Sequence, residues 1–491
     1  MISTSEKAAT VSEREGSASL PPTINPILAS WQRLLTEAPD TPTCYGLDGQ
    51  AMLSRYELDA KAVAIQKQLH GLPAGSIVAV AAANQPAWPA LFLASLRTGV
   101  ALMPLEAGHA LLQNAPWMQR MQISLMATLE KGEFSIAWSK AIEISGWPDG
   151  KNPDLLKVTS GTTSQPRAVR FRSSQLWHDV DQILRDMRLL PEDRNLAVIS
   201  FAHSYGFSSL VLPLLTAGIP FVMAENPLPA TLSLACQTGG ATVFPGVPAM
   251  FRALTASDAI RDLEPLRLCI SAGAPLPPET AGTFSAKFGL PIQVFYGSSE
   301  CGGIAYDNRP EAGLEAGIVG KPMRHVNLDF ESTPGPSPIT ISGPTVGDGY
   351  FPWDEDDGEV LREGRFKPSD LVELRPEGLG LAGRLDDLIN VAGRKLNPLE
   401  VELAIVGSGA AEEAVVFGCG RPGRETQIVA AVVGALPGDA EFRRRCAGRL
   451  SAWMIPDRIW RMHRIPANTR GKVSRKELAR QFAEASEHWP T

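Results

Sequence analysis

This 491-residue sequence has no excess of basic residues and few cysteines. Charged residues make up only 20% of the chain, and the formal net charge of −7 offers no basic surface to nucleic acid. The six cysteines include no CxxC pair of the kind that zinc and redox sites use, so we expect reduced thiols. Neither a nucleic-acid partner nor a structural zinc site is therefore predicted.

An apolar signal peptide is also missing. Residues 1–22 are polar and are expected to form a disordered tail, which makes the cytoplasm the expected compartment. One charge-free run, 206–223, reaches the eighteen residues that a transmembrane helix needs at minimum. Pro213, Gly218 and Pro220 interrupt it, so we interpret this run as a buried helix followed by a strand of a covered sheet, and predict no membrane span.

Short apolar runs alternate with helix-length segments over most of the chain. The runs expected to be buried strands are 77–82, 198–201, 219–222, 242–245, 268–271 and 292–295. This alternation predicts an α/β fold with covered, largely parallel sheets, whose ligands bind beyond the carboxyl ends of the strands.

The pattern changes near Leu385 to that of a small α+β unit. Its expected elements are a helix at 399–406, strands at 413–417 and 428–433, and a helix at 440–453. We therefore predict a large N-terminal domain over residues 23–384 and a small, mobile C-terminal domain over residues 385–491.

The first segment with chemical content is a loop rich in hydroxyls and glycine, residues 159–163, after the apolar run 155–158. Backbone N–H groups and hydroxyls in such a loop could surround a polyphosphate. A surface loop rich in serine and threonine is the alternative explanation.

A second segment, residues 295–300, ends an expected strand with an aromatic residue, a glycine, two serines and a carboxylate. Tyr296 could stack on a purine, Ser299 could donate to a phosphate, and Glu300 could bind Mg²⁺ through oxygen. A buried tyrosine beside a helix-capping glutamate is the alternative.

Two further segments contain Asp370 with the run 383–395, and Lys472 within the run 466–478; each alone could be a solvated loop. Together, in this order, the four segments resemble the adenylate-forming superfamily of acyl-CoA synthetases, non-ribosomal peptide adenylation domains and luciferases. The intervening segments that also match are Asn84, Pro104-Leu105, 246–248, 271–276, 317–322 and Gly349-Tyr350.

The resemblance implies ATP-dependent activation of a carboxylic acid to an acyl-adenylate, with Mg²⁺, followed by transfer to a thiol. The residues that it assigns to ATP are Thr159, Ser160, Gly161, Thr162, Thr163, Gly273, Ala274, Tyr296, Gly297, Ser299, Asp370 and Arg384. It assigns Glu300 to the metal. The carboxylate of Asp370 can accept from both ribose hydroxyls at once.

The same resemblance implies two catalytic residues and a hinge. Lys472 would act on the reacting phosphate and His203 would lie beside the carboxylate, while an exposed lysine and a satisfied interior histidine are the alternatives. Asp386 matches the hinge about which the small domain would rotate between the half-reactions. Gly393 would line the coenzyme A tunnel in the second orientation.

The phosphate loop departs from the family pattern Thr-Gly-x-Pro-Lys-Gly. Ser164 and Ala168 restrict the backbone where glycine is usual, and Arg167 keeps a cation with a different donor geometry. Ser369 replaces the glycine that commonly precedes the ribose aspartate. We still expect adenylation, from a stiffer loop.

The acid is expected to be aryl or of medium acyl length. The residues that suggest a pocket with aromatic and small walls are Tyr205, Phe207, Ala272 and Gly273. No acidic anchor for an α-amino group follows His203, which disfavours amino acids. Coenzyme A is the expected thiol because no carrier domain follows the Lys472 segment. A stand-alone enzyme that loads an acyl-carrier protein and a catalytically silent nucleotide-binding protein remain as alternatives.

Overall fold

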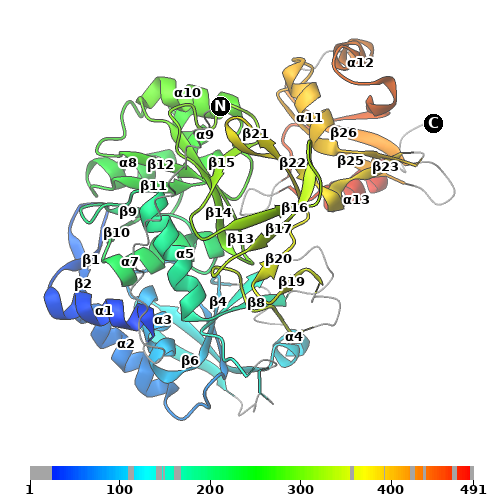
Figure 1. Ribbon diagram of the computed structural model, residues 1–491. Helices are drawn as coiled ribbons and strands as arrows, with labels where there is room; N and C mark the ends of the chain where they lie inside the picture. Colours follow the sequence, from blue (N-terminus) through cyan, green and yellow to red (C-terminus); the bar gives the residue numbers. More distant parts are fainter. Residues whose placement is uncertain are drawn as a thin grey trace, which may run out of the picture.

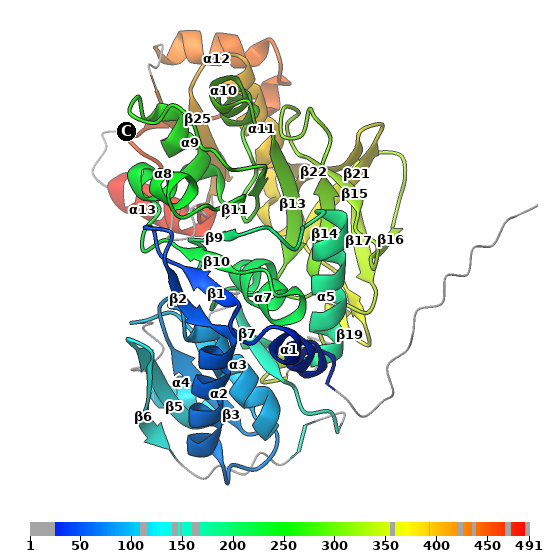
Figure 2. The ribbon, with the colours of Figure 1, turned by 90° about the vertical axis from the view of Figure 1, so that its left-hand side faces the viewer.

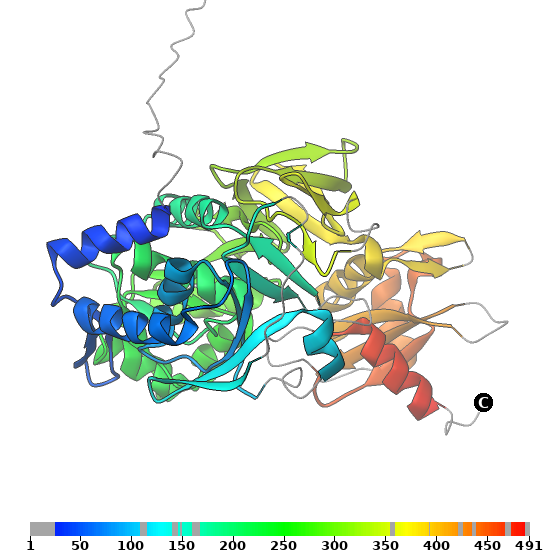
Figure 3. The same cartoon turned by 90° about the horizontal axis from the view of Figure 1, so that it is seen from below.

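The computed structural model describes residues 25–108, 115–139, 146–147, 150–159, 167–353, 359–391, 393–420, 426–434, 438–466 and 473–486. The predicted tail, residues 1–22, lies outside these ranges. Two large sheets with their helices form the body of the molecule, and a smaller C-terminal unit lies at the opposite end from the first helix, α1 (Pro26–Glu37) (Figures 1 and 3).

The first large sheet has seven strands in the order β18-β8-β7-β4-β3-β5-β6. Its parallel centre consists of β3 (Ile77–Ala81), β4 (Ala101–Leu105), β5 (Ile123–Glu130) and β7 (Leu155–Thr159). Its antiparallel flanks are β6 (Glu133–Ser139), β8 (Arg167–Phe171) and β18 (Tyr350–Phe351). Strands β3 and β4 are buried along their whole length, as their uninterrupted apolar runs require.

Helices α2 (Arg55–Leu69) and α3 (Trp88–Thr98) pack against each other beside this sheet. A capping box begins α2, because the Ser54 hydroxyl accepts from the backbone N–H of Glu57 and the Glu57 carboxylate accepts from the backbone N–H of Ser54. Gly99 ends α3 with a φ of 71°, which a side chain would disfavour.

The second large sheet has fifteen strands in the order β19-β20-β17-β21-β22-β15-β14-β13-β12-β11-β9-β10-β1-β2, with β16 paired to β17. Its parallel part consists of β1 (Pro42–Tyr45), β9 (Asn195–Ala197), β10 (Phe221–Met223), β11 (Val243–Gly246), β12 (Leu268–Ser271) and β13 (Ile292–Ser298). The remaining strands are β2 (Ala51–Ser54), β14 (Gly302–Asp307), β15 (Ile318–Pro322), β16 (Asn327–Phe330), β17 (Ser337–Ser342), β19 (Leu361–Arg362), β20 (Arg365–Phe366), β21 (Asp370–Arg375) and β22 (Gly378–Arg384), which pair antiparallel. The predicted α/β class is confirmed, with antiparallel flanks on both sheets.

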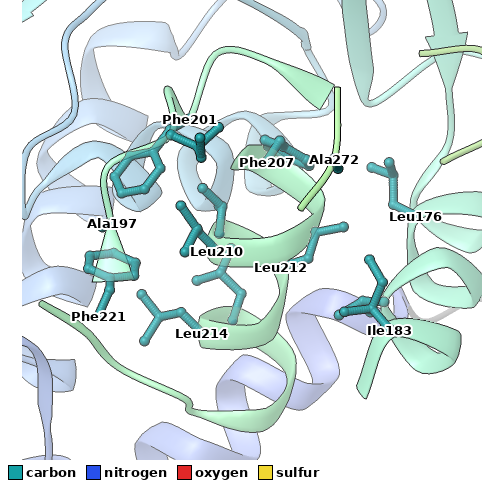
Figure 4. Close-up of a cluster of buried hydrophobic side chains, with 14 of the residues drawn as sticks. Leu176, Ile183, Ala197, Phe201, Phe207, Leu210, Leu212, Leu214, Phe221 and Ala272 are labelled. Atoms are coloured by element: carbon teal, nitrogen blue, oxygen red, sulfur yellow. The ribbon is translucent and has the colours of Figure 1, made fainter. Parts of the chain in front are cut away.

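The helices α5 (Ser173–Asp186), α6 (Ser204–Gly206) and α7 (Leu212–Ala217) pack with the π-helical turn Phe207–Val211 and contribute to the main core. Helix α5 runs beside β14 (Figure 2). The charge-free run 206–223 is a helix followed by strand β10, as predicted, and its Phe207, Leu210, Leu214 and Phe221 side chains are buried together (Figure 4). Within the described ranges, no helix has both the length and the apolar character needed to cross a membrane.

The prediction of a strand at 198–201 was wrong, because the strand ends at Ala197. The following residues leave the sheet and bind a side chain instead. Asn84 donates from Nδ2 to the Ile199 carbonyl at 2.8 Å and accepts from the Phe201 N–H at 2.8 Å. The side-chain amide of Asn84 thus binds the backbone groups that a neighbouring strand would otherwise pair with.

Four more helices belong to the large body: α4 (Ala115–Arg120), α8 (Pro229–Gln237), α9 (Pro248–Ala256) and α10 (Pro278–Phe288). Helices α9 and α10 pack on each other, and α10 contacts β13.

The C-terminal unit has apolar clusters of its own, separate from the main core. Its elements are β23 (Ile389–Val391), β24 (Arg394–Leu396), α11 (Pro398–Gly407), β25 (Glu413–Cys419), β26 (Gln427–Val433), α12 (Asp439–Ala447), β27 (Arg458–Arg461) and α13 (Arg475–Ser486). Helix α12 stops at Ala447 rather than at the predicted 453, since Gly448 follows and a separate 3-10 turn begins at Ala452. The domain boundary at 384/385 and the mobility of this unit stay predictions.

Candidate active site

The second predicted segment lies at the carboxyl end of β13 and contacts strand β21, which is far away in the sequence. Tyr296 donates from its hydroxyl to Asp370 Oδ2 at 2.7 Å. Asp370 pairs across the sheet with Arg384, whose Nε lies 3.7 Å from Asp370 Oδ1. Burial, and next the negative charge of Asp370, raise the pKa of Tyr296, so its hydroxyl keeps the proton that it donates. The structure thus brings together three residues that the sequence assigned to ATP.

Glu300 follows β13 in a turn that its neighbours stabilise. The Ser298 hydroxyl accepts from the backbone N–H of Glu300 at 3.1 Å, and Tyr350 donates from its hydroxyl to Glu300 Oε1 at 3.0 Å. The Arg167 guanidinium lies 3.6 Å from the centre of the Tyr350 ring. One tyrosine therefore contacts both the arginine after the phosphate loop and the carboxylate predicted to bind the metal.

No group of three or more carboxylate, imidazole or thiol side chains suited to a metal occurs in the described part of the chain. A single carboxylate such as that of Glu300 is enough for a Mg²⁺ ion that arrives with a nucleotide, because Mg²⁺ is commonly held by one or two carboxylates plus substrate phosphates.

His203 and Tyr205 lie at the start of α6, which precedes strand β13 in the sequence. The Nε2 atom of His203 is 2.8 Å from Glu106 Oε1, which orients the imidazole. Tyr205 donates to the Ile270 carbonyl at 3.2 Å, and its ring centre is 5.9 Å from that of Phe295. Segment 203–205, the predicted acyl-site segment, thus contacts β12 and β13 through Tyr205.

Comparison with known proteins identifies the family of this chain. A family profile described as "AMP-binding enzyme" matches residues 31–351. The chain belongs to this family.

Relatives of this AMP-binding enzyme include acid–CoA ligases. Feruloyl-CoA synthase from Amycolatopsis sp is 26% identical over 471 residues, covering 88% of this chain and 95% of the relative. Oxalate–CoA ligase from Arabidopsis thaliana is 25% identical over 466 residues, covering 84% and 90%. The structure of ATP-bound MatB from Rhodopseudomonas palustris has a TM-score of 0.82 at 22% identity, covering 94% of this chain and 99% of that one, so the two share the fold.

Other predicted residues of this AMP-binding enzyme are placed as follows. Thr159 ends β7 and donates to the Arg167 carbonyl at 3.3 Å, whereas Ser160, Gly161, Thr162, Thr163 and Lys472 lie outside the described residues. Tyr296 and Gly297 lie near the carboxyl end of β13. Gly273, with a φ of 83°, and Ala274 follow the carboxyl end of β12. Ser299 follows β13 and is half-buried.

The predicted hinge and tunnel residues lie in the C-terminal unit and just before it. Asp386 belongs to the 3-10 turn Leu385–Asp387, and its Oδ2 lies 3.6 Å from Arg384 Nη2. Gly393 has a φ of 84° and donates to Asn390 Oδ1 at 2.9 Å, and among the described residues other than its chain neighbours no atom lies within 4 Å of the place where its Cβ would stand. Their roles stay predictions.

Phe207, a predicted wall of the acyl pocket, lies in the core, and its place in that pocket stays a prediction. Its side chain is 1% exposed, and its ring centre lies 5.0 Å from that of Phe92 and 6.1 Å from that of Trp88. Core packing accounts for this residue. An aromatic residue on an apolar helix that follows a polar segment can face either way, and the sequence alone could not tell which.

Two site residues escaped the sequence analysis. Glu106 directly follows β4 and reaches His203, and Lys157 interrupts the apolar run of β7. The signal for Lys157 was available, because a lysine between Leu156 and Val158 in a buried strand needs partners.

Proposed function

We propose that this AMP-binding enzyme activates a carboxylic acid with ATP, releases pyrophosphate, and transfers the acyl group to coenzyme A. The observation that carries the proposal is the contact of Tyr296 and Arg384 with Asp370, beside the turn that holds Glu300. A ring beside a carboxylate suits an adenosine, since the ring can stack on the purine while the carboxylate accepts from the ribose hydroxyls.

In the first half-reaction, a carboxylate oxygen of the acid forms a bond to the α-phosphorus of ATP, and the bond to pyrophosphate breaks. Arg384 can offset charge on the phosphates, and His203, whose Nε2 contacts Glu106, can donate from Nδ1 to the carboxylate when the imidazole carries both protons. Glu300 would hold Mg²⁺, which neutralises charge on the phosphate oxygens. In the second half-reaction, the thiol of coenzyme A attacks the acyl carbonyl and AMP leaves.

We propose an aryl acid or an acid of medium acyl length as the substrate. Tyr205, Phe207, Ala272 and Gly273 are the proposed walls, and the names of relatives such as feruloyl-CoA synthase support an aromatic acid. Cytoplasmic localisation is supported by the cysteines, all six of which lie in the described ranges and are free.

The experiment that tests this proposal is acid-dependent exchange of pyrophosphate into ATP over a panel of aryl and aliphatic acids. Thioester formation is then measured with coenzyme A and, separately, with holo acyl-carrier proteins. Exchange without transfer to coenzyme A, but with transfer to a carrier, would favour the carrier-loading alternative. If the parent protein exchanges no pyrophosphate into ATP with any acid of the panel, a catalytically silent nucleotide-binding role would be supported.

The hydroxyl of Tyr350 offers a test of the metal assignment. Tyr350→Phe removes the donor to Glu300 but keeps the ring on which Arg167 stacks. We expect the Mg²⁺ concentration for half-maximal exchange to rise roughly tenfold, because partners that orient a metal ligand typically contribute this much to metal affinity. Tyr306→Phe is the matched control, since that hydroxyl donates to Gln293 instead. An unchanged Mg²⁺ requirement in Tyr350→Phe would count against Glu300 as the ligand.

The proposed hinge is tested with Asp386→Pro. Proline restricts φ at the turn between β22 and β23, so rotation of the C-terminal unit should be hindered. Thioester formation is expected to fall on the order of tenfold more than adenylation, with accumulation of acyl-adenylate in single-turnover assays. Asp386→Ala, which removes the carboxylate near Arg384 without restricting φ, should keep both half-reactions coupled. Equal losses in both half-reactions of a folded Asp386→Pro variant would refute the hinge.

A further inference from the structure

A buried lysine lies where strand β7 approaches the phosphate loop. Lys157 is 3% exposed and stands two residues before Thr159. A buried ammonium destabilises a protein strongly unless polar and charged groups surround it. Burial lowers the pKa of Lys157, and the negative charge of Asp179 opposes that shift.

The ammonium of Lys157 is satisfied from the helical layer. Its Nζ donates to Ser204 Oγ at 3.1 Å and lies 3.5 Å from Ser208 Oγ. Ser208 donates in turn to Asp179 Oδ2 at 2.7 Å. The Phe171 ring centre is 4.5 Å from Nζ, which adds a cation–π contact. Lysine and aspartate thus share one buried network through a serine.

Besides the strand before the phosphate loop, the network reaches two parts of the candidate site. Ser204 stands between His203 and Tyr205, the two residues of the acyl-site segment. Asp179 is 2% exposed and accepts from the backbone N–H of Gly303 at 2.9 Å, just beyond the turn that carries Glu300. A Cβ on Gly302 would stand 2.2 Å from Asp179 Oδ1, so this carboxylate lies directly against that turn.

We propose that Lys157 is a positioning residue for adenylate formation. Through Ser204 it fixes the acyl-site segment 203–205 relative to the strand that leads into the phosphate loop. In-line attack requires the carboxylate and the α-phosphate to be aligned, and a misplacement of about 1 Å can reduce the rate on the order of 10²-fold. This inference rests on the proposed function.

The alternative is that Lys157 only balances the buried charge of Asp179. Two variants separate the roles. Lys157→Met leaves Asp179 without its buried cation and should lower the Tm. Lys157→Met with Asp179→Asn removes both charges and should recover most of the lost Tm. Positioning through Ser204 is still lost in the double variant.

We expect the double variant to form acyl-adenylate about 10- to 100-fold more slowly than the parent, measured as kcat. ATP affinity of the Ser204→Ala variant, measured by calorimetry, should change less than about twofold, because this substitution removes only the contact on the acyl side of the network. Ser204→Ala should show a similar loss of kcat with a smaller fall in Tm than Lys157→Met, because Ser208 Oγ and the Phe171 ring still face the ammonium. Ser209→Ala, five residues further along at a buried serine whose hydroxyl has no hydrogen bond to Lys157, serves as the matched control.

Recovery of the adenylation rate together with the Tm in the double variant would overturn the positioning role, as would a parent-like rate in Ser204→Ala. A parent enzyme without acid-dependent exchange would instead overturn the proposed function, and this inference with it. The calorimetric and thermal measurements do not depend on turnover, so the two failures can be told apart.

Discussion

Replacement of Lys472 by alanine is expected to slow acyl-adenylate formation on the order of 10²–10³-fold. Negative charge builds on the α-phosphate and on the leaving pyrophosphate as the carboxylate attacks, and a nearby ammonium would stabilise that charge. The conversion of supplied acyl-adenylate to thioester should be spared, because the proposed rotation takes this lysine away from the site before the thiol attacks. Measurement of each half-reaction separately checks both expectations.

The structure supplies a matched control for that experiment. Lys472 lies outside the described residues, but α13 begins three positions later at Arg475, whose Nη2 is 2.7 Å from Glu402 Oε1 within the C-terminal unit. Lys476 is exposed on α13, so Lys476→Ala removes an equal charge from the same region. Parent-like adenylation by Lys472→Ala, or equal losses in both half-reactions of a folded variant, would rule out the proposed role.

Buried strands were predictable where an apolar run coincided with its hydrogen-bonding partners. The run 268–271 is strand β12, because neighbours pair with it on both sides. The run 198–201 is equally apolar but lies beyond the pairing range of β9, and Asn84 takes the place of a strand. Hydropathy reports burial, whereas pairing depends on residues far away in the sequence.

The sequence could name candidate site residues, but not the contacts between them. The sequence assigned both Tyr296 and Asp370 to ATP. Only the order of the strands between them in the sheet shows that the Tyr296 hydroxyl donates to the Asp370 carboxylate. The burial of Phe207 was not predictable, because helical periodicity does not reveal that Trp88 and Phe92 cover it. Lys157 was missed because motifs describe the loop and not the strand that supports it.

Loss of the Asp370 carboxylate is expected to have the largest effect on nucleotide binding. Asp370→Ala removes the proposed acceptor for both ribose hydroxyls, and hydrogen bonds to a charged group contribute about 1.5–3 kcal/mol. The dissociation constant for ATP should therefore rise roughly 10- to 150-fold, measured by calorimetry on the folded variant. Pyrophosphate exchange should require correspondingly more ATP.

Two variants show whether that loss reflects the ribose contact. Tyr296→Phe removes the hydroxyl that donates to Asp370 but keeps the ring and the carboxylate, so the ATP dissociation constant should change less than about fivefold. Glu373→Ala removes a carboxylate on the same strand that pairs with Arg375, away from Tyr296, and should leave ATP binding unchanged. Parent-like affinity in Asp370→Ala would refute the ribose assignment. A loss in Tyr296→Phe as large as that in Asp370→Ala would mean that the tyrosine–aspartate hydrogen bond shapes the site, rather than the direct contact of Asp370 with the nucleotide.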